Sequence, residues 1–212
     1  MSESSTRVEA FSDGVFAIAI TLLILEIKVP HGIDHGELWA GLRALWPSFV
    51  AFFLSFFVIL IMWVNHHELL RLVRGVGYPF FFANGFVLLT VTFVPFPTAV
   101  LAEYLGTPQA RNAVAFYSGT FVINSIAWGL LFMTIVRGRL LRPDVDAEAV
   151  ARIRRAYTSG PLVYALSTAV ALFQPTIGLL LNVSLWVLWV RLCYHTTAEA
   201  QRRRARLAGN PG

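Results

Sequence analysis

The sequence is poor in charged residues, and this shortage indicates its class. Only 14% of the 212 residues are Asp, Glu, Lys or Arg, against about 25% in a typical soluble domain, and 57% are hydrophobic. The apolar residues gather in long runs, several of which reach the roughly 20 residues needed to cross a membrane core about 30 Å thick. We therefore expect an integral membrane protein with no room for a separate soluble domain.

Cysteine is almost absent, and so are catalytic motifs. Cys193 alone excludes an internal disulfide and a thiolate metal cluster. The sequence has no HExxH motif, glycine-rich phosphate loop, Ser-His-Asp spacing or paired carboxylates. His66 and His67 are adjacent and point about 100° apart on a helix, so one metal site cannot easily use both. We expect no enzyme, no cofactor and no bound metal.

The apolar runs predict an all-α fold of six transmembrane helices in a single domain. Their approximate limits are residues 8–29, 38–67, 79–104, 110–136, 156–173 and 176–194, followed by a basic tail over 195–212. Pro47 is a candidate kink, and Pro95 and Pro97 interrupt the third helix. The first run is interpreted as a retained helix, because Glu9 and Asp13 lie inside it and no signal-peptide cleavage site is present.

The basic residues predict the orientation of the chain. With the N-terminus inside, fourteen of the 17 Lys and Arg residues fall on the inner side, and only Lys28, Arg43 and Arg111 fall on the outer side. Cytoplasmic segments carry the excess of positive charge in membrane proteins. We therefore expect a plasma-membrane protein with both termini in the cytoplasm, and we attribute its net charge of +5 to the membrane rather than to nucleic acid.

Polar residues inside the expected spans form three sets at the same membrane depth. The sets are Arg7, Glu9, Ser12 and Asp13 on the first helix, Trp63, Asn65, His66, His67 and Glu68 on the second, and Asn84 on the third. Such groups are costly in a membrane unless they find partners. The pattern predicts a hydrogen-bonded polar layer, which either only pins three helices together or also serves gating or proton sensing.

The first helix also carries a stripe of branched aliphatic residues. At about 100° per residue, Ile18, Thr21, Leu22 and Leu25 share one face of the helix. Ser12 and Asp13 point elsewhere. Taken alone, this stripe is interpreted as a lipid-facing or packing surface.

A longer pattern resembles a known family. Arg7, Phe11, Ser12 and Asp13 form an RxxxFSD motif that opens the first helix. Further residues match on the second helix and at the end of the third: Trp63, Asn65, His67 and Pro95 to Thr98. Together they resemble the prokaryotic branch of the lysosomal potassium channel family, transmembrane protein 175.

The resemblance implies a potassium-permeable, potassium-selective leak channel. Six-helix subunits would assemble as a homotetramer without a re-entrant pore loop, and the partners would be other copies, K⁺ ions and the lipid bilayer. The first helix would line the pore, with Ile18, Leu22 and Leu25 as the constriction and Thr21 beside them. The motif residues would hold that helix against the second and third helices, through Trp63 and His67; they are Arg7, Phe11, Ser12, Asp13, Trp63, Asn65 and His67.

Two other functions stay open on the sequence. A proton-coupled secondary transporter would use Asp13, His67 or Glu26 as its titrating group. A non-conducting scaffold would need the polar layer only for packing. Within the channel hypothesis, either Thr21 or the aliphatic rings would set the selectivity.

Overall fold

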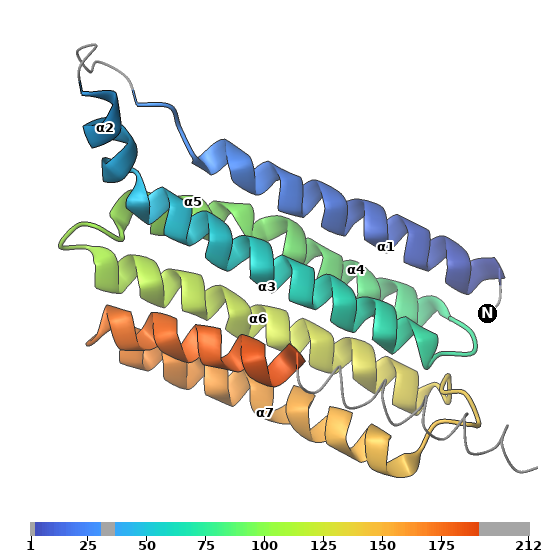
Figure 1. Cartoon of the computed structure of the whole chain (residues 1–212). Helices are drawn as coiled ribbons and strands as arrows, with labels where there is room; N and C mark the ends of the chain where they lie inside the picture. The colour runs from blue at the N-terminus through green and yellow to red at the C-terminus, as the bar shows by residue number, and fades with distance from the viewer. Residues whose placement is uncertain (1–2, 31–36, 191–212) are drawn as a thin grey trace, which may run out of the picture.

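The computed structural model describes residues 3–30 and 37–190, and the long helices lie side by side along one direction (Figure 1). The described part contains no β-strand, which agrees with the all-α prediction. The elements are α1 (Glu3–Leu22), the 3₁₀ turn η1 (Leu23–Glu26), α2 (Leu38–Ala44), α3 (Trp46–Arg71), α4 (Tyr78–Phe93), α5 (Pro95–Tyr104), α6 (Ala110–Arg137), α7 (Ala147–Ala171) and a last helix, Pro175–Val190. The predicted tail over 195–212, the last residues of the sixth predicted helix and Cys193 lie outside the described residues.

Two of the predicted helices are broken near their prolines. The run 38–67 consists of α2 and α3, which meet at Leu45, just before Pro47 in the first turn of α3. The run 79–104 consists of α4 and α5, and Pro95 begins α5. Proline has no N–H to donate and clashes with the preceding turn, so it fits the start of a helix and interrupts its interior. The first helix tightens into η1 and ends at Glu26, before the predicted limit at residue 29.

The fifth predicted helix begins earlier than expected. α7 starts at Ala147 rather than near residue 156, so part of the basic segment 137–155 is helical. The side chain of Asp146 caps the helix by accepting the Glu148 N–H at 3.2 Å, and Arg152 pairs with Glu148 one turn away at 3.3 Å. Hydropathy alone missed this turn because the turn is charged.

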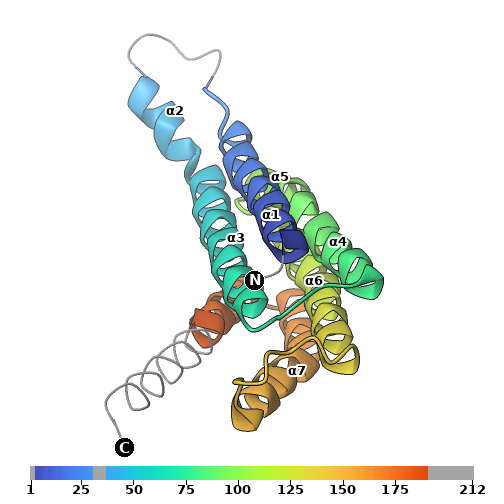
Figure 2. The ribbon, with the colours of Figure 1, turned by 90° about the vertical axis from the view of Figure 1, so that its right-hand side faces the viewer.

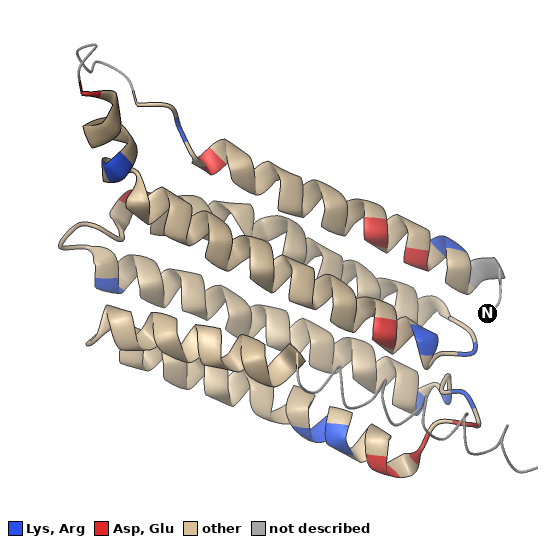
Figure 3. Ribbon diagram, in the orientation of Figure 1, with Lys and Arg blue, Asp and Glu red and all other residues tan. Residues whose placement is uncertain are grey.

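Four segments are long and apolar enough to cross a membrane. They are Ser5–Glu26, Trp46–Arg71, Tyr78–Tyr104 and Ala110–Arg137. Helix Pro175–Val190 is apolar but shorter, and α7 carries more charge. Charged residues gather toward the helix ends, and the middles of the helices are largely free of them (Figure 3). The prediction of a membrane protein is thus supported, while six crossings remain a prediction for α7 and the last helix.

Helix α6 lies at the centre of the bundle. It packs against α7 on one side and against α4 and α5 on the other, and its Tyr117, Phe121 and Leu131 are fully buried. Helix α1 packs on α3 and α4, far from α7 (Figures 1 and 2). Near the N-terminal end of α1, two backbone bonds join the loops after α3 and α6: Arg74 N–H to Leu140 O and Arg142 N–H to Leu72 O, each 2.9 Å. This frame leaves one face of α1 uncovered.

Candidate functional site

Helix α1 has one buried face and one exposed face. Its buried residues recur every three or four positions, as expected for one side of a helix: Val8, Ser12, Phe16, Ala19 and, in η1, Leu23. On the opposite side Ile18 is 60% exposed, Leu22 43% and Leu25 65%. The predicted stripe therefore faces away from the other helices that the structure describes.

Thr21 lies on the exposed face among these aliphatic residues. Its Oγ1 is 2.9 Å from the carbonyl oxygens of Ala17 and Ile18, one turn back in the same helix. The hydroxyl hydrogen is therefore used within the helix. The oxygen still presents lone pairs on the stripe, which are the groups that a cation would contact.

Two side-chain pairs join α1 to α3. Trp63 Nε1–H donates to Asp13 Oδ1 at 2.8 Å, and His67 Nδ1 lies 2.9 Å from Glu9 Oε1. Glu9 and Asp13 are four residues apart, as are Trp63 and His67. Because α1 and α3 run in opposite directions, equal spacing on both helices aligns the two pairs. Trp63 therefore bonds to a residue of the FSD motif, whereas His67 contacts Glu9, which lies outside that motif.

A buried chain of bonds continues from α1 to α4 and back to α3. Asn84 Nδ2–H donates to Ser12 Oγ at 3.1 Å, and Asn84 Oδ1 lies 2.7 Å from His66 Nε2. An amide oxygen can only accept, so in this orientation His66 carries its proton on Nε2. The His66 ring, which is fully buried, also packs between Phe16 and Trp128, with ring centroids at 5.4 and 6.0 Å. The predicted polar layer over three helices is present, and we call it the α1 network: Glu9, Ser12, Asp13, Trp63, His66, His67 and Asn84.

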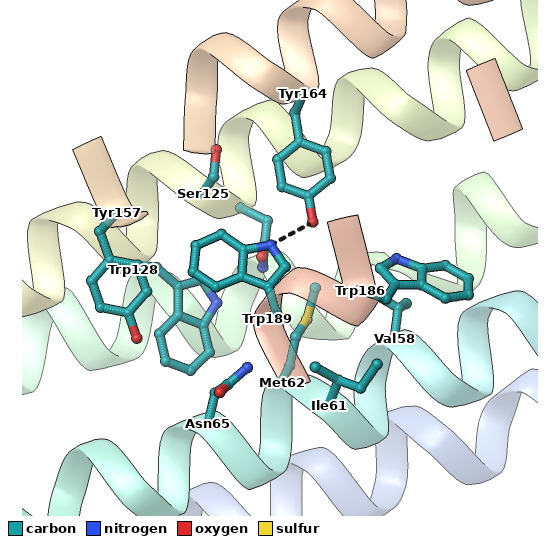
Figure 4. Close-up of a pocket in the computed structure, with 11 residues that line it drawn as sticks. Val58, Ile61, Met62, Asn65, Ser125, Trp128, Tyr157, Tyr164, Trp186 and Trp189 are labelled. Atoms are coloured by element: carbon teal, nitrogen blue, oxygen red, sulfur yellow. Dashed lines mark hydrogen bonds between the residues drawn. The ribbon is translucent and has the colours of Figure 1, made fainter. Parts of the chain in front are cut away.

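Three of the motif residues lie outside this network. Asn65 points away from α1 and lines a small pocket with Trp128, Tyr157 and Trp189 (Figure 4), so the structure does not place it at the first helix. Adjacent residues point about 100° apart, and Asn65 is two positions from Trp63. Arg7 and Phe11 line a surface groove between α1 and α4, and Phe11 is 67% exposed.

His66, Asn84 and Glu9 were expected in the polar layer but not among the motif residues. The sequence carried a signal for His66. It follows Met62 by four positions and Ile59 by seven, and all three are buried on one face of α3. A helical wheel of α3 would have separated the inward His66 from the partly exposed His67.

The candidate site consists of the hydrogen-bonded α1 network and the exposed apolar stripe of α1. No cluster of three or more His, Cys, Asp or Glu side chains able to hold a metal occurs in residues 3–30 and 37–190. Long apolar helices, charge at their ends and polar ties near one end define an integral membrane protein of the α-helical bundle type.

Comparison with known proteins identifies the family. Residues 7–95 match the family described as endosomal/lysosomal potassium channel TMEM175. The chain is 49% identical over 168 residues to the potassium channel Cha6605_3372 of Chamaesiphon minutus, which covers 78% of this chain and 83% of that protein. It is also 49% identical over 173 residues to the potassium channel B446_29190 of Streptomyces collinus, with 81% and 84% covered. The chain therefore belongs to the TMEM175 family, and the resemblance to its prokaryotic branch is confirmed.

A solved structure agrees with this assignment. The crystal structure of a lysosomal potassium-selective channel TMEM175 homolog from Chamaesiphon minutus superimposes with a TM-score of 0.80 at 41% identity. The match covers 91% of this chain and 99% of that chain. The family is one of ion channels rather than enzymes, which agrees with the absence of catalytic motifs from the sequence.

Proposed function

We propose that this protein is a potassium-permeable, potassium-selective leak channel whose pore is lined by α1 from four copies of the chain. The main support for this proposal is the exposed stripe on α1, formed by Ile18, Thr21, Leu22 and Leu25. The other face of the same helix is hydrogen-bonded to α3 and α4. The relatives named potassium channels support the choice of ion. One chain supplies only one wall of the proposed pore, so several copies around a common axis are needed to enclose it.

The stripe gives the proposed pore an apolar constriction. Rings of Ile18, Leu22 and Leu25 would exclude water when narrow and admit it when slightly wider, so small movements of α1 would gate the pore. Thr21 contributes the polar oxygens of this stretch. The α1 network fixes the rotation of α1, and with it the direction in which the stripe faces.

Charge supports the proposed orientation in the plasma membrane. In the described chain, the end of the bundle near the start of α1 carries nine arginines, and the opposite end carries Lys28, Arg43 and Arg111. The nine are Arg7, Arg71, Arg74, Arg137, Arg139, Arg142, Arg152, Arg154 and Arg155. The positive-inside rule assigns the arginine-rich end, and thus the N-terminus, to the cytoplasm.

Potassium flux from liposomes tests the pore. We expect Ile18→Asn and Leu22→Asn to raise the flux and to reduce the preference for K⁺ over Na⁺, because an amide hydrates the constriction. Leu89→Asn is the matched control: Leu89 is 63% exposed, but it lies on α4. Equal flux and selectivity in all three variants and in the wild type would exclude α1 as the pore wall.

The same liposomes separate the channel from the two other functions. A carrier that couples protons through Asp13 or His67 would move H⁺ in a fixed ratio to its substrate, which a pH dye inside the vesicle reports. A scaffold would give no flux beyond that of empty vesicles. Passive flux that follows the potassium gradient, with single-channel steps, is the result we expect.

A further inference from the structure

A groove on the outer side of the bundle combines an apolar wall with a basic end. It lies between α6 and α7 and has a volume of about 500 Å³. That is within the range of small-molecule sites, roughly 300–1,000 Å³. Gly129, Leu130, Met133 and Pro161 are among the residues that line it, and Leu130 and Met133 are 42% and 41% exposed. The wall is therefore of the kind that contacts lipid.

Two guanidinium groups line the same groove. Arg137 is the last residue of α6, and Arg154 lies two turns into α7. Within residues 3–30 and 37–190 neither of them forms an ion pair. The carboxylates nearest in sequence are engaged elsewhere, since Asp144 pairs with Arg142 at 3.2 Å and Glu148 with Arg152 at 3.3 Å.

We infer that this groove binds one anionic phospholipid, with its phosphate on Arg137 and Arg154 and its acyl chain along Gly129, Leu130 and Met133. Guanidinium groups bind phosphate oxygens through paired hydrogen bonds, and basic pockets between membrane helices suit anionic headgroups. A free phosphate ion would leave the apolar wall unused. A zwitterionic lipid would bring its own cation close to the two arginines.

The position of the groove fits this ligand. Arg137 ends a helix long enough to span the membrane, so its guanidinium lies where lipid headgroups lie. The wall residues belong to the preceding two turns of α6, at the depth of the acyl chains. The inference rests on the membrane placement of α6 and not on potassium conduction, so either proposal can fail without the other.

Native mass spectrometry of the purified full chain in detergent tests the inference. Phosphatidylglycerol and phosphatidylcholine with the same acyl chains are titrated separately, and glycerol 3-phosphate serves as the headgroup without a tail. We expect the wild type to prefer phosphatidylglycerol. The double variant Arg137→Gln/Arg154→Gln should lose about thirtyfold of that affinity, because each basic residue near a headgroup contributes about 1 kcal/mol.

Two variants act as control and as a second probe. Arg111→Gln/Arg155→Gln removes the same charge from α6 and α7 without touching the groove, and it should retain wild-type affinity. Gly129→Leu should block the acyl chain. A Cβ at Gly129 meets only Tyr157 O, at 3.6 Å, which is ordinary van der Waals contact.

Four results would overturn the inference. They are equal binding of the two lipids by the wild type, equal loss in the two double variants, full competition by glycerol 3-phosphate, and unchanged binding by Gly129→Leu. If Gly129→Leu instead changed the mass of the oligomer while lipid binding persisted, the groove would belong to a neighbouring copy. The comparison of the two lipids uses the wild type alone. It can therefore contradict the inference even if one of the variants misfolds.

Discussion

Two of the polar networks in the described part of the bundle differ in kind. The α1 network includes the ionisable side chains Glu9, Asp13 and His67 and lies near the charged end of the helices. The second, which we call the frame network, joins α6, α7 and the last helix through neutral groups only. In it Asn182 Nδ2 lies 2.7 Å from Ser118 Oγ, 3.0 Å from Ser167 Oγ and 2.9 Å from Gly178 O.

The difference follows from the cost of charge in an apolar medium. The frame network is almost completely buried, so hydroxyls and amides can join it but carboxylates would be expensive. In the α1 network the His67 side chain is 42% exposed and that of Glu9 16%, which keeps an ionisable pair near water. The frame is therefore held together by neutral groups alone, whereas the attachment of α1 also uses ionisable side chains.

The largest expected effect is in the frame. A Cβ at Gly178 would lie 2.6 Å from Ala171 Cβ and 2.8 Å from Ala171 Cα, so Gly178→Ala must push the last helix away from α7. We expect a loss of about 3 kcal/mol in stability, the upper end for overpacking, measured as a fall in the thermal midpoint of the detergent-solubilised protein. In the control Gly119→Ala the new Cβ meets Thr168 Cγ2 at 3.8 Å, which is ordinary contact, and stability should hold. Equal midpoints for the two variants would contradict a tightly packed frame.

A smaller effect is expected from the centre of the α1 network. Asn84→Leu leaves the buried Ser12 hydroxyl and His66 Nε2 without their amide partner. Each unsatisfied buried group costs about 1–3 kcal/mol, so we expect a total loss of about 2 kcal/mol after partial relaxation. The double variant Asn84→Leu/Ser12→Ala removes one stranded group and should recover part of the loss. If the double variant is less stable than Asn84→Leu, the bond between Ser12 and Asn84 is not what holds α1 to α4.

The sequence predicted the all-α fold because its apolar runs are long. The predicted helix limits were wrong where capping residues, paired charges or prolines decide the limits of a helix and hydropathy does not. Asp146 and Glu148 begin α7 through a cap and a turn of paired charges, which an apolar window does not count. Prolines in the sequence indicated the breaks at Leu45 and Val94. Whether a proline kinks one helix or separates two helices depends on the packing around it.

The sequence located the polar layer and the stripe of α1, but it did not determine which polar side chains pair. The stripe of α1 follows from helical periodicity, so its exposure could be anticipated. Which partner each polar group takes depends on the register of α1 against α3, which no single helix encodes. This is why His67 is found on Glu9 and why Asn65 belongs to the pocket beside Trp128.

One substitution made in both regions sharpens the comparison. Trp63→Phe removes the bond to Asp13 at 2.8 Å, and Trp189→Phe removes the bond to the Tyr164 hydroxyl at 3.2 Å. A hydrogen bond to a charged group is worth about 1.5–3 kcal/mol and one to a neutral group about 1, so Trp63→Phe should cost more stability. We also expect Trp63→Phe alone to change potassium flux, because of these two tryptophans only Trp63 is bonded to α1. If Trp189→Phe changes the flux as much as Trp63→Phe does, the frame also influences the proposed pore.

The smallest expected effect concerns Thr21 and separates the two faces of α1 itself. Thr21→Val keeps the shape of the side chain and removes a hydroxyl that is bonded only within its own helix, to the carbonyls of Ala17 and Ile18. Stability should therefore change by less than about 0.5 kcal/mol, as for other exposed positions. Any change in the ratio of K⁺ to Na⁺ flux in liposomes then reports the pore oxygen rather than misfolding. We expect this change to be smaller than that caused by Ile18→Asn, because in the proposed pore the aliphatic rings would form the constriction and Thr21 would lie beside them. If Thr21→Val instead causes the larger change, the threonine oxygens rather than the aliphatic rings set the selectivity.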